Sequence, residues 1–170
     1  DDSITAPAPE AIVHPEQWPE VAFPMVLTEE GEAHVQALLA QMTLEQKVGQ
    51  IIQSYIASVT PEEVREYRLG SVLNGGNSGP GGDDLAPAEE WLALADAFYA
   101  ASMDTAPGEP AIPIVWGPDA VHGHSNIVGA TIFPHNIGLG ATRDTDLVRR
   151  IGAATATEIE VTGIDWNFSP

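Results

Sequence analysis

Residues 112–140, IPIVWGPDAVHGHSNIVGATIFPHNIGLG, join an apolar run to a dense group of polar side chains. The run 112–116 is apolar and largely β-favouring, and Gly117-Pro118 closes it, so it predicts a short buried strand that ends in a turn. Polar side chains follow that turn at once: Asp119, His122, His124, Asn126 and His135. Because α/β enzymes bind their ligands just beyond the carboxyl ends of strands, this segment predicts the functional face.

On either side of this segment, the sequence predicts strands that alternate with helices. Amphipathic spacing, a capping box over Thr43–Gln46 and helix-starting prolines indicate the helices, and Gly163 is expected to end the last one. The predicted helices are 33–42, one from Thr43, one from Pro61, one from Pro87, and about 145–162. The predicted strands are 48–52, 71–73, 112–116 and 164–168. Such alternation builds a parallel sheet through right-handed crossovers.

The lengths of the loops favour a barrel over a dinucleotide-binding sheet. The long loops 74–86 and 117–143 both follow strands, as they do at the active-site end of a (β/α)8 barrel. A dinucleotide-binding sheet needs a glycine-rich turn after its first strand, and no glycine lies between Ile52 and Gly70. The predicted fold is therefore α/β, the first half of a (β/α)8 TIM barrel. Four strands would leave open sheet edges, so we expect the barrel to continue beyond residue 170.

Composition and charge restrict the class of partner. The chain has 170 residues and is 44% hydrophobic, which is typical of one globular domain. Its net charge of −19, from 25 acidic and 6 basic residues, repels phosphate backbones and anionic lipids, so nucleic acid and membrane surfaces are poor partners. A neutral substrate such as a sugar is compatible with this charge. The chain contains no cysteine, which excludes disulfides and thiolate metal sites.

The first 32 residues differ from the rest of the chain. Residues 1–20 contain four prolines and no helical period. We expect residues 1–32 to form an N-terminal arm of a protein that is secreted or periplasmic and bacterial. Residues 33–170 are expected to form the barrel portion.

Five separated motifs, in order, resemble the N-terminal domain of glycoside hydrolase family 3, in particular its β-glucosidase and exo-β-glucanase branch. The motifs are MTLEQKVGQ, GSVLNGG, WGPDAVHG, GATIFPHNIGLGATRD and GIDWNFSP. The resemblance covers roughly Ala33 to Pro170. It implies a retaining, exo-acting enzyme that releases glucose from the non-reducing ends of β-glucans or glucosides, without a cofactor. It also implies that the nucleophile and the acid/base lie outside these residues, so no catalytic residue is assigned here.

The same resemblance implies three substrate-binding residues, Asp119, Gly75 and Gly76. Asp119 resembles the residue that accepts hydrogen bonds from sugar hydroxyls, and a carboxylate can accept from two adjacent hydroxyls with charge-assisted strength. Gly75 and Gly76 resemble a loop whose backbone approaches the sugar, where a side chain would leave no room. From the residues alone, a role in capping the turn after Gly117-Pro118 is favoured for Asp119, and a flexible turn remains an alternative for the two glycines.

Two other functions stay open at this point. His-x-His after a strand can hold zinc, so a metal-dependent barrel hydrolase could use His122 and His124, with His135 or a residue beyond Pro170 as a further ligand. A carbohydrate-binding barrel without catalysis is the other alternative. Within the resemblance, His122 and His135 are expected to make structural hydrogen bonds, and His124 departs from the family pattern, which favours an exposed position. No metal ligand is assigned.

The four tryptophans could stack on sugars, but their positions favour the core. Trp91 lies on the apolar face of a predicted helix, and Trp116 and Trp166 lie in predicted strands. We therefore expect these three side chains to be buried. Trp18 falls in the N-terminal arm and is left unassigned.

Overall fold

The computed structural model describes residues 28–75 and 78–169. Its helices are α1 (Glu29–Gln41), α2 (Leu44–Gln50), α3 (Pro61–Tyr67), α4 (Ala88–Met103), α5 (Asn136–Thr142) and α6 (Thr145–Glu160), with 3-10 turns at Ile56–Ser58 and Pro80–Gly82. Its strands are β1 (Gln53–Tyr55), β2 (Ser71–Asn74) and β3 (Val115–Pro118). Most of the predicted arm, Trp18 and Gly76 lie outside the described residues. None of the helices in the two ranges has the length and apolar character that a membrane span requires.

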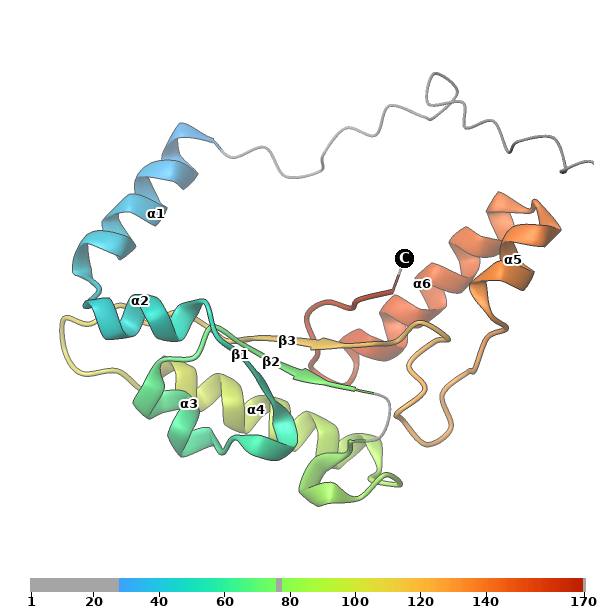
Figure 1. Ribbon diagram of the computed structural model, residues 1–170, viewed down its shortest axis with the longest axis horizontal. Coiled ribbons are helices and arrows are strands. Elements are labelled where there is room, and N and C mark those ends of the chain that lie inside the picture. Colours follow the sequence, from blue (N-terminus) through green and yellow to red (C-terminus); the bar gives the residue numbers. More distant parts are fainter. Residues whose placement is uncertain (1–27, 76–77, 170) are drawn as a thin grey trace, which may run out of the picture.

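The three strands form one parallel sheet in the order β1-β2-β3. Ser54 pairs with Val72, which in turn pairs with Trp116. Helices α3 and α4 pack against each other and cover one face of this sheet (Figure 1). The predicted α/β class, with parallel strands alternating with helices, is confirmed.

The core lies between the sheet and α4. Val72 and Trp116 are paired and point to the same face, where both are buried. Helix α4 presents Trp91 and Phe98 to that face, with ring centroids 5.9 Å and 5.7 Å from the Trp116 ring. The prediction that Trp91 and Trp116 belong to the core is confirmed, because they are only 1% and 2% exposed. Large aromatic rings contribute much of the apolar burial in a core of this size.

The predicted capping box at the start of α2 is present. The Thr43 hydroxyl accepts from the backbone N–H of Gln46 at 3.2 Å, and the Gln46 side chain accepts from the Thr43 N–H at 3.0 Å. Helix α3 begins in the same way, with Thr60 and Glu63 as the reciprocal pair and Pro61 in its first turn. These local contacts fix the points at which the chain leaves each loop and enters a helix.

The predicted strand 48–52 is wrong. Helix α2 continues to Gln50, and β1 begins only at Gln53. A short apolar run does not distinguish a helix from a strand, and here the capping box starts a helix that the run continues. Gly49 suits this arrangement, because a Cβ at that position would lie 2.0 Å from the Tyr67 carbonyl oxygen. The close contact holds α2 against the end of α3.

The predicted fourth strand is also wrong as a regular element. The segment 164–169 runs beside β3, where the N–H groups of Asp165 and Phe168 donate to the carbonyls of Trp116 and Pro118, but it is not part of the sheet ladder. The Trp166 side chain lies over Gly117, the β3 residue that pairs with Leu73, on the sheet face opposite α4. It is 37% exposed, so its predicted burial is wrong.

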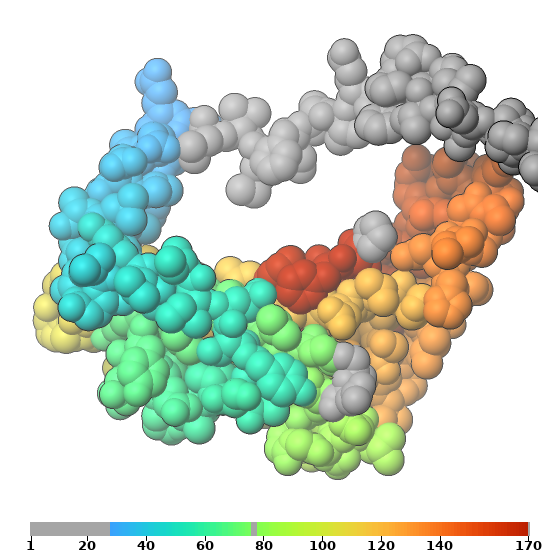
Figure 2. Space-filling view, viewed as in Figure 1, coloured from blue at the N-terminus to red at the C-terminus, as the bar shows by residue number. Residues whose placement is uncertain are grey.

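Two further differences concern α1 and α5. Helix α1 begins at Glu29, four residues before the predicted start, and it buries none of its residues. Its atoms, blue in Figure 2, stand out from the rest of the described chain. Helix α5 falls within a predicted loop, because its seven residues include two glycines, which have low helix propensity.

Candidate functional site

The two described residues of the predicted sugar site lie at the carboxyl edge of the sheet. Asn74, the last residue of β2, pairs with Pro118, the last residue of β3. Gly75 and Asp119 therefore begin neighbouring loops, on strands that are about 4.8 Å apart in a parallel sheet. Asp119 is exposed to solvent, and its carboxylate accepts no hydrogen bond from any described residue. This placement is the one expected for a ligand-binding residue of a barrel.

The carbonyl oxygen of Gly75 connects it to the loop that begins at Asp119. Asn126 donates to that oxygen from its side-chain nitrogen at 3.2 Å, and the Ser78 hydroxyl lies 3.4 Å from it. A Cβ built at Gly75 would meet no atom within 4 Å. Packing within the described protein therefore does not require glycine at this position. Gly76 lies outside the described residues.

The residue after Asp119 adopts a left-handed backbone conformation. Ala120 has a φ of 40° and is only 2% exposed. A non-glycine residue in this region stores strain on the order of 1–2 kcal/mol, and such residues cluster at functional sites. The turn buries the Ala120 methyl group while it leaves the Asp119 carboxylate in solvent.

The loop 119–135 then folds back on itself. Gly123 has a φ of 84°, and a Cβ there would lie 2.2 Å from the Thr131 carbonyl oxygen. The Phe133 N–H donates to the His122 carbonyl at 2.8 Å, beside this crossing. Only glycine fits both the backbone conformation and the crossing, so this loop has a defined shape.

His124 is fully buried, and the expectation that it is exposed is wrong. Its Nε2 lies 2.9 Å from the Thr162 hydroxyl oxygen, and its ring meets the Trp91 ring edge to face at 6.1 Å. Burial lowers the pKa of His124 from 6.5 to about 4, against the opposing effect of the Glu158 negative charge. The imidazole is therefore neutral near pH 7.

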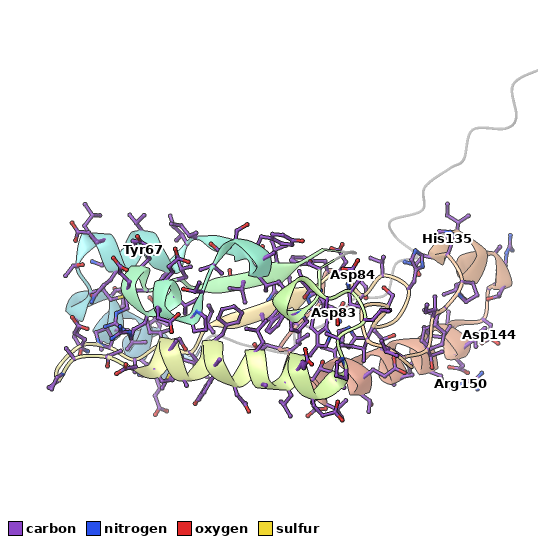
Figure 3. The ribbon with its side chains drawn as sticks, turned by 90° about the horizontal axis from the view of Figure 1, so that it is seen from below. Tyr67, Asp83, Asp84, His135, Asp144 and Arg150 are labelled. Carbon is purple, nitrogen blue, oxygen red and sulfur yellow. The ribbon has the colours of Figure 1, made fainter. Side chains whose placement is uncertain are left out.

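The two other histidines of the loop pack against each other. The rings of His122 and His135 meet edge to face with centroids 4.5 Å apart, and His135 lies at the start of α5 (Figure 3). The described residues contain no group of three side chains that could hold a metal ion, and the Nε2 of His124 is already bonded to Thr162. The metal-dependent alternative therefore has no support in the described part of the chain.

The structure adds Asn74 to the residues that shape this edge, which sequence reasoning missed. Asn74 is fully buried, and its Oδ1 accepts a 2.7 Å hydrogen bond from the indole N–H of Trp116. The sequence did contain a signal for this burial: Asn74 lies two residues after the buried Val72 in the same strand, so both side chains point to the same face of the sheet. The loop that follows carries the exposed residues Asp83 and Asp84 (Figure 3).

Comparison with known proteins shows the family. Residues 43–170 match the family model described as Glycosyl hydrolase family 3 N terminal domain. Because this match covers most of the chain, the chain belongs to glycosyl hydrolase family 3.

Individual relatives agree with this assignment. The crystal structure of exo-1,3/1,4-beta-glucanase (ExoP) from a Pseudoalteromonas species is similar, with a TM-score of 0.78 and 56% identity over 84% of this chain and 18% of that one. The lysosomal beta glucosidase of Dictyostelium discoideum is 29% identical over 82% of this chain and 18% of its own length. A beta-N-acetylglucosaminidase/beta-glucosidase of Cellulomonas fimi is 30% identical over 88% of this chain and 24% of its own. The chain thus spans about a fifth of the length of these relatives.

Proposed function

We propose that this chain forms the N-terminal part of the barrel of an exo-acting β-glucosidase or β-glucan glucohydrolase, and that Asp119 binds the terminal glucose. One observation carries the proposal: the exposed Asp119 carboxylate lies at the carboxyl edge of a parallel sheet, in a chain 56% identical to the matching part of an exo-1,3/1,4-beta-glucanase. The carboxylate can accept hydrogen bonds from two neighbouring hydroxyls of a sugar. Binding of this kind at a closed pocket end accepts a chain terminus and rejects a chain interior.

The chemistry itself would be supplied by the remainder of the protein. Retaining glycosidases use a nucleophile and an acid/base whose carboxyl groups are about 5–5.5 Å apart. The family resemblance assigns neither group to these 170 residues. We therefore give Asp119 a binding role, in which its hydrogen bonds orient the glucose ring for attack by a carboxylate from the remainder of the protein.

The sugar-binding role is tested by removing the carboxylate from the full-length protein. Asp119→Ala should lower kcat/KM for p-nitrophenyl β-D-glucoside by roughly 30- to 1000-fold, because a charge-assisted bond that tightens in the transition state contributes about 2–4 kcal/mol. The matched control is Asp96→Ala, which removes an exposed carboxylate from α4. Activity of Asp119→Ala within threefold of wild type would leave Asp119 a turn residue.

Gly75 offers a second test of the same pocket. Since a Cβ at Gly75 meets nothing within 4 Å, Gly75→Ala should fold normally. If the sugar approaches this backbone, the added methyl group should raise KM for the glucoside about tenfold or more, with an unchanged melting temperature. An unchanged KM would remove Gly75 from the pocket.

Two product measurements define the reaction. NMR of the first glucose released from p-nitrophenyl β-D-glucoside should show the β-anomer, as retention requires, and laminarin should lose glucose from one end only. First-formed α-glucose would exclude the retaining mechanism. Calorimetric binding of cellobiose without hydrolysis of any β-glycoside would instead indicate a carbohydrate-binding barrel without catalysis.

A further inference from the structure

Two side-chain contacts hold the loop that begins at Asp119 against the C-terminal end of α6 and the turn that follows it. His124 Nε2 lies 2.9 Å from the Thr162 hydroxyl oxygen, and the Thr131 N–H donates to a Glu158 carboxylate oxygen at 3.1 Å. Between Asp119 and His124, the residues Ala120 and Gly123 are buried and hold left-handed conformations. The exposed Asp119 therefore precedes a short segment whose path is fixed at its buried end by His124.

The Thr162 hydroxyl determines which nitrogen of His124 carries the proton. This hydroxyl has one hydrogen, and its oxygen lies 2.7 Å from the Ile159 carbonyl oxygen, which can only accept. With its proton donated there, Thr162 must accept from His124. The neutral imidazole therefore carries its proton on Nε2. Its Nδ1 is a buried acceptor without a partner among the described residues.

From these contacts we infer that His124 is a positioning residue, whose neutral imidazole anchors the loop that begins at Asp119 to the turn that follows α6, through an Nε2–H···O bond to Thr162. This inference rests on the proposed function, because Asp119 is the sugar-binding residue there. His124 touches no substrate in this arrangement. It acts by holding the loop in the conformation that presents the Asp119 carboxylate.

The anchor should depend on pH, and the surroundings of His124 give the direction. Helix α6 contributes Glu158, whose charge favours the protonated ring, whereas α4 contributes the uncharged Trp91 indole. In the loop that contains His124, the His122 ring packs against the His135 ring and not against His124. Burial outweighs Glu158, so the pKa of His124 lies near 4 in the anchored loop, compared with 6.5 for a solvated imidazole. His124 in an opened loop therefore binds a proton at a higher pH than His124 in the anchored loop. As a result, the anchor weakens as the pH falls from 6.5 towards 4.

The experiment uses activity of the full-length protein on p-nitrophenyl β-D-glucoside at pH 7 and its dependence on pH. His124→Ala and Thr162→Val each remove one partner of the bond, and both should lower kcat/KM on the order of 10- to 100-fold through misplacement of the loop. His124→Gln keeps an N–H donor that does not titrate. It should stay within threefold of wild type at pH 7 and should lose less activity than wild type between pH 6.5 and pH 4.

His34→Gln is the matched control, because His34 is an exposed histidine on α1. Its profile should coincide with that of the wild type. Equal losses in His124→Gln and His124→Ala would overturn the inference, since the donor would then have no role. A correctly folded His124→Ala protein with wild-type kcat/KM would overturn it as well.

Hydrogen exchange separates this inference from the proposed function. Backbone amides of 119–135 should lose protection in His124→Ala and Thr162→Val, and should keep it in His124→Gln. Unchanged protection in the first two variants would refute the anchor whether or not the protein is active. Absence of β-glycoside hydrolysis in the wild type would refute the proposed function, while the exchange result would still decide on the anchor.

Discussion

Helices α1 and α4 show the same apolar spacing in the sequence, yet they have opposite environments in the structure. Helix α4 buries Trp91, Ala95 and Phe98 against the sheet. Helix α1 buries none of its residues, and its Val35 and Leu39 are 43% and 39% exposed. The comparison shows that periodicity predicts a helix and its apolar face, whereas burial depends on whether another element covers that face.

The two helices also begin differently. Thr28 caps α1, where its hydroxyl accepts from the Gly31 N–H at 3.0 Å, and three glutamates lie in the first turn. Helix α4 begins after Pro87, without a side-chain cap. We conclude that α1 is stabilised mainly by local contacts along its own chain, and α4 mainly by tertiary packing.

The largest expected effect comes from the buried face of α4. Phe98→Ala should lower the free energy of unfolding by about 3–5 kcal/mol, because it removes a buried ring that packs on Trp116. Urea unfolding followed by tryptophan fluorescence measures this change. Leu92→Ala, on the exposed side of the same helix, is the control and should cost less than about 1 kcal/mol. Similar losses of unfolding free energy in both variants would show that the buried and exposed sides of α4 contribute equally to stability.

A second prediction compares the histidine that packs on α4 with the one on α1. Burial holds the pKa of His124 near 4, below its unfolded value of 6.5. Its contribution to stability is therefore complete above pH 6.5 and is lost as the pH falls towards 4, with a slope that approaches about 1.4 kcal/mol per pH unit. His124→Gln should reduce this slope in urea titrations between pH 6.5 and pH 4, and His34→Gln should leave it unchanged. A reduced slope in His34→Gln with an unchanged slope in His124→Gln would contradict the assignment of this pH dependence to His124.

The third prediction concerns the cap of α1. Thr28→Ala should destabilise the helix locally by about 1 kcal/mol, seen as a roughly fivefold loss of hydrogen-exchange protection in the first two turns of α1. The global urea midpoint should not change, because α1 contributes no residue to the core. Thr28→Ser keeps the hydroxyl and should restore the protection. A shift of the global midpoint would show that α1 and the core unfold together.

The smallest effect is expected on the apolar face of α1 itself. Leu39→Ala should change the free energy of unfolding by no more than about 0.5 kcal/mol, because alanine has good helix propensity and Leu39 is 39% exposed. The same urea experiment measures it. A cost close to that of Phe98→Ala would show that α1 is packed against another surface in solution.

The sequence predicts those features that depend on local chemistry. The Thr43–Gln46 capping box, the helix started by Pro61 and the left-handed Gly163 are all present. The parallel order of the strands also follows from the alternation of elements. The position of Asp119 directly after a strand is predictable as well. The predicted bounds of that strand, 112–116, are wrong: β3 is Val115–Pro118. Gly117 and Pro118 continue the pairing with Leu73 and Asn74 and do not form a turn.

Other features depend on contacts between distant residues, which periodicity cannot show. The hydrogen bond from His124 to Thr162 spans 38 positions, and the one from Asn126 to Gly75 spans 51. The sequence wrongly predicts a strand at 48–52 because a short apolar run does not distinguish a strand from the continuation of the helix that Thr43 caps. The sugar-binding roles of Asp119, Gly75 and Gly76 remain predictions that the experiments above test.

The pairing of Asn74 with Pro118 also limits how the chain can change in length. A residue inserted within 115–118 would shift Asp119 by about 3.3 Å along the strand and would turn the following side chains to the opposite face. The connection from Asp104 to Pro113 carries no such register, since it joins α4 to β3 through an irregular loop. Homologues and engineered variants should therefore gain and lose residues in that connection, while the four positions of β3 keep a constant length.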